Sequence, residues 1–229
     1  MKNVYLCLLL FITFSCSSQS VTESVIGPDE FEKGISQKNI QLLDVRTDAE
    51  FKKGHLEHAL LADWTNKDQF FERVKYVDKD KPVYIYCLVG GRSAAAAEWM
   101  RKNGYTSVIE LKGGIHAWET AGKKIQDQAP QKQITLEEYM ASLPPDKTTL
   151  VDIGADWCPP CVKMKPVISE VLESSPGLPF ISIDAGSQAL LMSSLHITSI
   201  PGFIIYKNGK EVWRKEGIVS KEEFLAHLQ

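Results

Sequence analysis

The sequence predicts two consecutive α/β domains. A chain of 229 residues with 44% hydrophobic residues fits two compact domains of roughly 100 residues better than one. In both halves short apolar runs alternate with amphipathic stretches, a pattern typical of a largely parallel sheet with helices packed on it. A polar run, "KKIQDQAPQK", separates the halves, and Pro130 interrupts any helix there. We expect domains at residues 25–126 and 133–229, joined by a linker at 127–132.

The elements of each half follow from these runs. In the first half we expect strands at the apolar runs, residues 40–45, 58–62, 82–87 and 107–113, and helices in the amphipathic stretches between them. In the second half we expect strands at 148–155 and 178–185, a hairpin at 202–217, and helices at 135–143, 158–175, 188–197 and 221–228. The hairpin is indicated by Asn208-Gly209, because this dipeptide tolerates the positive φ angles of a tight turn.

The N-terminus, "MKNVYLCLLLFITFSCSSQS", predicts a targeting segment. Its apolar run, Val4 to Phe14, is too short for a membrane span of about 20 residues but suits the core of a signal peptide. It resembles a bacterial lipoprotein signal, which implies that residues 1–15 are removed and that Cys16 is acylated and held at a membrane. Ordinary signal cleavage and an uncleaved anchor remain alternatives. All three place the chain outside the cytoplasm, in a periplasm, with residues 16–24 as a polar tether.

Charge and cysteine content narrow the function. The formal net charge of −3 is spread without a basic stripe, so nucleic acid is not expected as a partner. Beyond the predicted signal peptide and Cys16, three cysteines remain, at positions 87, 158 and 161. In an oxidising compartment cysteines that only stabilise a fold are normally paired. A close pair plus one lone thiol therefore points to reactive chemistry.

The close pair lies in "DWCPPCVK", residues 156–163. If a helix begins at Cys158, free backbone N–H groups and the helix dipole lower the pKa of that thiol, and Cys161 is placed one turn further to resolve a mixed disulfide. Pro159 and Pro160 suit a first helical turn but remove two N–H groups, so the effect on redox potential has no predicted sign. A zinc site needs four ligands that the sequence does not supply, so no metal is expected. A permanent disulfide here would close too short a loop to stabilise much.

Residues 133–229 resemble thioredoxin in "LVDIGADWCPPC", in "SIPG" at 199–202 and in "IIYKNGKEVWRKEG". The resemblance implies that Cys158 is the nucleophile and Cys161 the resolving thiol. It also implies roles for Asp152, a buried carboxylate that helps move a proton from Cys161, for Pro201, a cis-proline that faces the sulfurs and guides the incoming chain, and for Trp157, which packs beside the pair and binds substrate. Asp152 as a merely paired buried acid remains an alternative. Pro-Pro between the cysteines and Gly202 after the proline depart from the common pattern, and this leaves the preferred redox direction open.

The lone thiol, Cys87, follows an apolar strand and precedes a glycine-bearing loop and an alanine-rich helix that starts near Arg92 or Ser93. Such a loop can direct several N–H groups at one point, where the helix dipole adds positive potential. A thiolate or a persulfide on Cys87 fits there. Four residues separate Cys87 from Arg92, whereas cysteine phosphatases have five, so the loop suits sulfur better than phosphate. An inert buried cysteine is the alternative.

Residues 25–126 resemble a single-domain rhodanese, a sulfurtransferase, in "LLDVRTDAEFKKGHLEHA", "CLVGGRS" and "GGIHAWETAG". The resemblance implies that Cys87 carries a persulfide and that the following residues bind substrate: Leu88, Val89, Gly90, Gly91, Arg92 and Ser93. It implies structural roles for Asp44, Arg46, Glu50 and His55, and core packing for Trp118. Leu88 stands where many thiosulfate-using relatives have a cation, which puts thiosulfate as the sulfur donor in doubt.

The sequence therefore predicts an extracytoplasmic thiol-disulfide oxidoreductase coupled to a sulfurtransferase. Cys87 would carry a persulfide, and the Cys158/Cys161 dithiol would reduce persulfides or protein disulfides. The expected partners are a sulfane-sulfur donor, client proteins with disulfides or persulfides, an electron donor or acceptor of unknown identity, and a membrane; no cofactor is expected. The alternative is a general thiol-disulfide oxidoreductase whose first domain serves docking or sensing, and a non-catalytic lipoprotein scaffold is a third interpretation.

Overall fold

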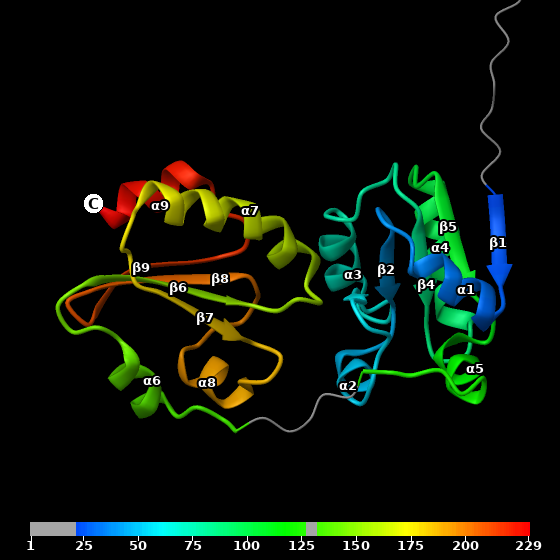
Figure 1. The fold of residues 1–229 in the computed structure, drawn as a ribbon, viewed down its shortest axis with the longest axis horizontal. Coiled ribbons are helices and arrows are strands. Elements are labelled where there is room, and N and C mark those ends of the chain that lie inside the picture. Colours follow the sequence, from blue (N-terminus) through cyan, green and yellow to red (C-terminus); the bar gives the residue numbers. More distant parts are fainter. Residues whose placement is uncertain (1–21, 127–131) are drawn as a thin grey trace, which may run out of the picture.

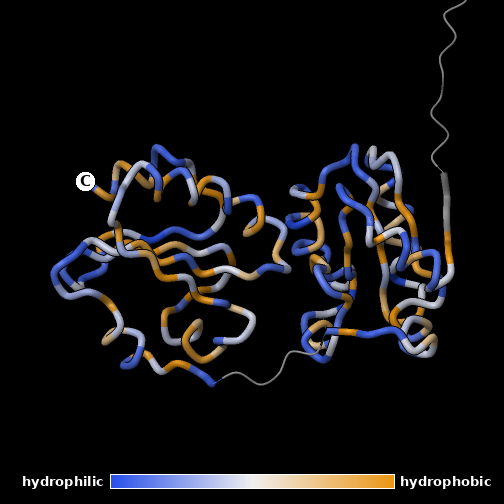
Figure 2. The backbone as a smooth tube through the Cα atoms, in the orientation of Figure 1, coloured by the Kyte–Doolittle hydropathy of each residue, from blue (hydrophilic) through white to orange (hydrophobic). Residues whose placement is uncertain are grey.

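The computed structural model describes residues 22–126 and 132–229, which form two α/β domains (Figure 1). This confirms the predicted fold class. The predicted signal peptide with Cys16 lies outside the described residues, as does nearly all of the predicted linker. Within the part of the chain that the structure describes, no helix is long and apolar enough to cross a membrane. Hydrophobic residues concentrate along the strands at the centre of each domain (Figure 2).

The first domain is built on a five-stranded parallel sheet in the order β1-β5-β4-β2-β3. The strands are β1 (Thr22–Ile26), β2 (Gln41–Asp44), β3 (Leu60–Leu61), β4 (Val83–Tyr86) and β5 (Ser107–Leu111). The helices are α1 (Pro28–Ile35), α2 (Asp48–Lys52), α3 (Lys67–Val74), α4 (Gly91–Lys102) and α5 (Gly114–Thr120). Parallel strands need crossover connections, and these place helices on both faces of the sheet.

Two apolar clusters hold these layers together, because successive strand residues point to opposite faces. Leu43 and Ile85 face one cluster with residues of α3 and α4, while Leu42 and Tyr86 face another with residues of α1, α2 and α5. The sheet is therefore buried on both sides, and the loops after its strands are left to carry chemistry.

The first strand begins earlier than the sequence indicated. Residues 22–24, which we assigned to the polar tether, pair with β5 from Thr22 opposite Ser107 onward. Backbone hydrogen bonds to a neighbouring strand do not require apolar side chains, so hydropathy alone did not detect this strand.

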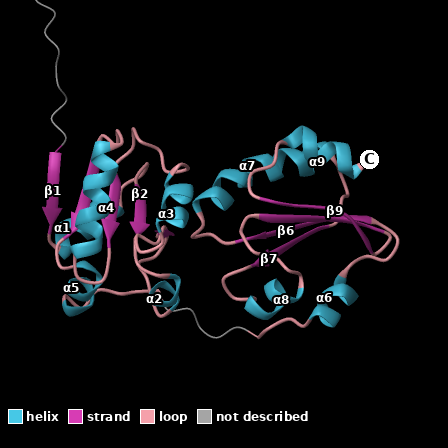
Figure 3. Ribbon diagram, turned by 180° about the vertical axis from the view of Figure 1, so that it is seen from behind, coloured by secondary structure: helices cyan, strands magenta, loops and turns pink. Residues whose placement is uncertain are grey.

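The second domain has a four-stranded mixed sheet in the order β7-β6-β8-β9. Its strands are β6 (Thr148–Gly154), β7 (Phe180–Asp184), β8 (Gly202–Lys207) and β9 (Lys210–Glu216), and its helices are α6 (Leu136–Ser142), α7 (Pro159–Ser174), α8 (Ala189–Ser194) and α9 (Lys221–Leu228). Helices α7 and α9 cover one face and α6 and α8 the other (Figure 3). Asn208 and Gly209 both have positive φ, 52° and 71°, and form the predicted hairpin turn between β8 and β9.

Candidate active sites: two thiol centres and the contact between the domains

Cys87 directly follows β4 and lies buried under the loop that leads into α4. The Gly90 N–H donates to its Sγ at 3.1 Å, and the Ser93 hydroxyl lies 3.5 Å away. Gly90 adopts φ 114°, a conformation that favours glycine and turns this N–H inward. Burial opposes ionisation of Cys87, but hydrogen bonds from Ser93, Gly90 and Val89 outweigh it, so the pKa of the thiol is lowered. The loop thus favours an anionic sulfur.

The start of α5 contacts the backbone of the Cys87 loop and holds it in place. Ile115 N–H donates to the Cys87 carbonyl at 2.9 Å, and His116 N–H donates to the Leu88 carbonyl at 3.1 Å. Gly114 makes the close approach possible: a Cβ at this position, where φ is 63°, would lie 2.4 Å from the Cys87 carbonyl oxygen. The motif "GGIH" was noted in the sequence only as part of a resemblance. Its supporting role depends on long-range contacts that the sequence pattern does not reveal.

Arg92 points to Glu50 and ties α4 to α2. Its two terminal nitrogens donate to the Glu50 carboxylate at 2.7 and 2.6 Å. The Arg92 guanidinium, helped by donors from Thr47, lowers the pKa of Glu50 to about 2 against the opposing effect of partial burial. Much of the positive charge that Arg92 could offer to an anion is therefore balanced by Glu50. Leu88 and Val89, at the mouth of the loop, are 43% and 62% exposed.

Three of the four residues assigned structural roles, Asp44, Arg46 and His55, are buried, whereas Glu50 is half-buried and pairs with Arg92. Asp44 is fully buried and receives hydrogen bonds from the Arg46 guanidinium, which also donates to the Gly54 carbonyl at 2.7 Å. The His55 ring stacks on Phe51, and its Nδ1 lies 3.0 Å from the Phe51 carbonyl oxygen. These contacts anchor the turn after α2 to the end of β2.

In the second domain Cys158 caps the N-terminus of α7, and Pro159 and Pro160 occupy its first turn. Cys158 and Cys161 form a disulfide. The Cys161 N–H donates to the Cys158 Sγ at 3.4 Å, so an N–H from the first turn of the helix points at the sulfur. Cys158 is 0% exposed and Cys161 is 7% exposed. The pair is therefore almost fully covered.

Asp152 and the loop containing Pro201 flank the dithiol. Burial raises the pKa of Asp152 to about 6, against a small opposing effect of Lys165. A Cβ placed on Gly154 would lie 3.5 Å from the Cys161 Sγ and 3.6 Å from an Asp152 carboxylate oxygen, so both groups border the same small space. A carboxyl group with a pKa of about 6 beside Cys161 can exchange a proton with the thiol of that residue.

The peptide bond between Ile200 and Pro201 is cis, and the Ile200 carbonyl oxygen lies 3.7 Å from the Cys158 Sγ. Glu216, at the end of β9, holds this loop by accepting hydrogen bonds from the backbone and hydroxyl groups of Thr198 and Ser199. Sequence reasoning missed Glu216 because its partners lie 17 and 18 residues away. No local pattern indicated it.

The tertiary structure brings Trp157 against the first domain. Its carbonyl oxygen accepts a hydrogen bond of 2.7 Å from the N–H of Leu61 in β3. Its ring lies 5.9 Å from the Phe51 ring and 5.2 Å from the Arg73 guanidinium carbon. The sequence placed Trp157 beside the dithiol but did not predict this contact between the domains.

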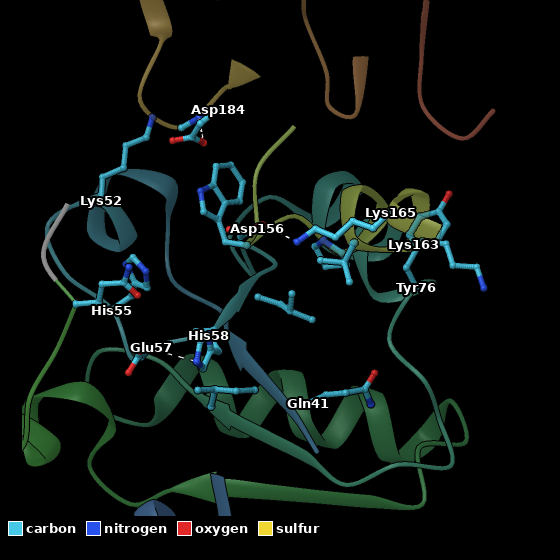
Figure 4. Close-up of a pocket in the computed structure, with 18 of the residues that line it drawn as sticks. Gln41, Lys52, His55, Glu57, His58, Tyr76, Asp156, Lys163, Lys165 and Asp184 are labelled. Atoms are coloured by element: carbon cyan, nitrogen blue, oxygen red, sulfur yellow. Dashed lines mark hydrogen bonds and ion pairs between the residues drawn. The ribbon is translucent and has the colours of Figure 1, made fainter. Parts of the chain in front are cut away.

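A cavity of about 1320 Å³ opens next to this contact and is lined by residues of both domains (Figure 4). Charged side chains of both signs line it, and Lys165 pairs with Asp156 at 2.6 Å. The charged and histidine residues of the lining are Lys52, His55, Glu57, His58, Asp156, Lys163, Lys165 and Asp184. Trp157 and Pro159 also line the cavity. Among the described residues, Cys87, Cys158 and Cys161 do not line it.

Comparison with known proteins identifies the class of both domains. The rhodanese-like domain family matches residues 27–121, and the thioredoxin family matches residues 130–229. The chain therefore belongs to the rhodanese-like family in its first domain and to the thioredoxin family in its second.

Individual relatives match one part of the chain. YqhL of Bacillus subtilis, an uncharacterised protein, is 34% identical over 115 residues, which are 50% of this chain and 87% of that protein. The tRNA uridine(34) hydroxylase of Acholeplasma laidlawii is 33% identical over 112 residues, 44% of this chain, and only 33% of the hydroxylase is spanned.

Among solved structures, a rhodanese-like domain protein from Staphylococcus aureus is 29% identical, with a TM-score of 0.40 over 47% of this chain and 100% of that chain. Oxidised mitochondrial thioredoxin 3 from Saccharomyces cerevisiae is 20% identical, with a TM-score of 0.38 over 42% of this chain and 92% of that chain.

Proposed function

We propose that this protein is an extracytoplasmic enzyme in which Cys87 carries a persulfide and the Cys158/Cys161 dithiol reduces persulfides or protein disulfides. A thiol redox and sulfurtransferase-like role follows from the two families. The observation that carries the finer proposal is the cradle around Cys87. Its donors from Gly90 and Ser93 lower the pKa of the thiol despite burial, and the same donors would stabilise a persulfide anion.

The proposed reaction reduces the Cys87 persulfide to a thiol and hydrosulfide, and an external dithiol supplies the electrons. The Cys158 thiolate attacks the outer sulfur of the Cys87 persulfide, which leaves a thiolate on Cys87 and a persulfide on Cys158. The Cys161 thiolate, formed by proton loss toward Asp152, then attacks the inner sulfur on Cys158. This step forms the Cys158–Cys161 disulfide and releases hydrosulfide. Two electrons and two protons from the external dithiol restore the pair.

The surroundings of Cys87 support a donor other than thiosulfate. Leu88 and Val89 present apolar side chains at the mouth of the loop, and the charge of Arg92 is balanced by Glu50. A small dianion gains little from such a mouth, because apolar groups offer it no compensation for lost hydration. We infer that the donor is an organic persulfide or an organic polysulfide.

Single-turnover transfer tests the coupled scheme. Full-length protein carrying a persulfide on Cys87 and a reduced dithiol is expected to regenerate the Cys87 thiol and release hydrosulfide. With Cys158→Ser both products should be lost. With Cys161→Ser the Cys87 thiol should still appear while hydrosulfide release falls, because Cys158 accepts the sulfur and cannot discharge it. Equal formation of the Cys87 thiol with and without Cys158 would refute the coupling.

The second candidate, a general thiol-disulfide oxidoreductase with the rhodanese-like domain as a docking module, is favoured by one observation. Phe51, Leu61 and Arg73 of that domain hold Trp157 next to the dithiol. Steady-state sulfurtransferase turnover with a polysulfide separates the two functions. Turnover that disappears in Cys87→Ser supports the persulfide carrier, whereas turnover at background in the unaltered protein supports the docking module.

A further inference from the structure

We propose that the rhodanese-like domain is a reversible cover for the dithiol of the same chain. The docking surface formed by Phe51, Leu61 and Arg73 holds the loop that presents Trp157. A protein client reaches Cys158 only after this contact opens. The cover itself depends on the thioredoxin-type dithiol and not on persulfide chemistry at Cys87.

The first support is a hydrogen bond between the edge of one domain and the loop of the other. β3 pairs with β2 on one side only, so the backbone groups on its other edge have no strand partner in the described sheet. The Leu61 N–H on that edge donates to the Trp157 carbonyl at 2.7 Å. The residue before the nucleophilic cysteine is thus held as a peptide is held when it adds to a sheet edge. A client that needs this backbone must displace Leu61.

Arg73 supplies the second support. It donates to the Leu61 carbonyl at 3.0 Å, and its guanidinium lies over the Trp157 ring. Burial lowers the pKa of Arg73 to about 10, against the opposing charges of Asp48 and Asp63. Removing this cation from water is costly, and the Leu61 carbonyl, the Trp157 ring and the charges of Asp48 and Asp63 offset only part of that cost, so the closed contact is only moderately stable. A contact of this kind can open and close.

The third support is the position of the sulfurs. Cys158 is 0% exposed in this arrangement, and the partly buried residues packed on its cluster are Ile200 and Trp157, the second of which the docking surface holds. A macromolecular disulfide therefore does not reach Cys158 before this packing opens. Leu61, Asp44 and Tyr86 are register partners across β3, β2 and β4. Because neighbouring strands lie about 4.8 Å apart, the Trp157 backbone is roughly 14 Å from that of Tyr86, which precedes Cys87. The closed form therefore separates the two thiol centres as well as covering one of them.

Arg73→Ala tests the cover, with Lys75→Ala as the matched control. Lys75 directly follows α3 and pairs with Glu72 in solvent, so its loss removes a charge without touching Trp157. We measure reduction of insulin disulfides driven by dithiothreitol in the full chain. Arg73→Ala loses the cation–aromatic contact and the hydrogen bond to the Leu61 carbonyl, so the rate is expected to rise at least about fivefold, and the Lys75→Ala rate should stay at the original value.

Amide hydrogen exchange provides a readout of the contact itself. The Leu61 N–H is bonded across the domains, whereas the neighbouring Ala62 N–H is bonded within its domain to the Asp44 carbonyl at 2.9 Å. In Arg73→Ala we expect faster exchange at Leu61 and unchanged exchange at Ala62. If Ala62 also exchanges faster, β3 itself is disturbed, and Arg73→Met, which keeps the apolar stem, replaces the first variant in the same comparison.

The proposal is overturned by any of three results: Leu61 exchanges as a free edge amide in the unaltered protein, insulin reduction is unchanged when Leu61 is released, or it becomes slower. Slower insulin reduction would show that the docking surface helps to bind client proteins. Because insulin reduction does not use Cys87, failure of the cover and failure of the persulfide scheme are distinguishable.

Discussion

Single residues set the protonation states on which both thiol centres depend. Cys87 is kept acidic by hydrogen bonds that overcome burial, whereas Asp152 is kept weakly acidic by burial that its few partners do not offset. The two groups show opposite outcomes of the same competition between desolvation and local donors. Removing the Asp152 carboxyl group should therefore affect both the stability of the second domain and proton transfer at its dithiol.

Asp152→Asn is expected to stabilise the thioredoxin domain at high pH. The pKa of Asp152 is raised from 3.8 to about 6 in the folded protein, so the ionised carboxylate destabilises the fold. This penalty grows as the pH rises from about 4 to about 6 and is complete above the folded-state pKa. We expect a gain of about 3 kcal/mol at pH 8 and almost none near pH 3.5. Denaturant unfolding at both pH values measures it.

The exposed Asp146→Asn serves as the control for Asp152→Asn and should show no such pH-dependent gain. Resolution of mixed disulfides by Cys161 should also slow in Asp152→Asn, because the proton acceptor is lost. A gain in stability that is equal at both pH values would contradict the burial argument.

At the scale of elements, each thiol is presented by a strand that ends where a helix begins. Cys87 lies between β4 and α4, and Cys158 between β6 and α7, so each sulfur accepts from an N–H at the N-terminus of a helix. The Cys87 junction has an additional support, because N–H groups at the start of α5 bond to the Cys87 and Leu88 carbonyls. Gly114 allows this close approach.

Gly114→Ala should damage this junction, and Gly122→Ala is its matched control. Both glycines have positive φ, 63° and 73°, but a Cβ on Gly122 meets nothing within 4 Å, whereas one on Gly114 meets the Cys87 carbonyl. Backbone strain alone should cost Gly122→Ala about 1 kcal/mol of unfolding free energy. Gly114→Ala should cost at least about 2 kcal/mol more, because backbone atoms must shift.

The Gly114 comparison is read by denaturant unfolding and by the alkylation rate of Cys87, followed on its own peptide by mass spectrometry. Only Gly114→Ala should slow alkylation at neutral pH, since its shifted loop loses donors to the sulfur. Equal behaviour of the two alanine variants would show that α5 does not support the loop.

At the scale of the whole molecule, a predicted lipid anchor, two enzyme-like domains and a contact between them lie on one chain. Residues 1–21 are outside the described structure, so the anchor rests on the sequence. Cys16→Ser should move the protein from the membrane fraction to the soluble periplasmic fraction in a bacterial host, and Cys7→Ser should not. Retention of Cys16→Ser in the membrane fraction would favour the uncleaved anchor.

The sequence by itself determined the two α/β domains and the local setting of each thiol. These features are encoded over short stretches: apolar periodicity along strands, Asn208-Gly209 in a hairpin, and prolines after Cys158 at the start of a helix. Only the tertiary structure decided that β1 begins at Thr22, that Glu216 holds the loop before Pro201, and that Leu61 and Arg73 hold Trp157. Each of these contacts joins groups that are distant in sequence, through backbone atoms or through a single side chain. Contacts of this kind produce no periodic pattern in the amino-acid sequence, so the sequence alone does not predict them.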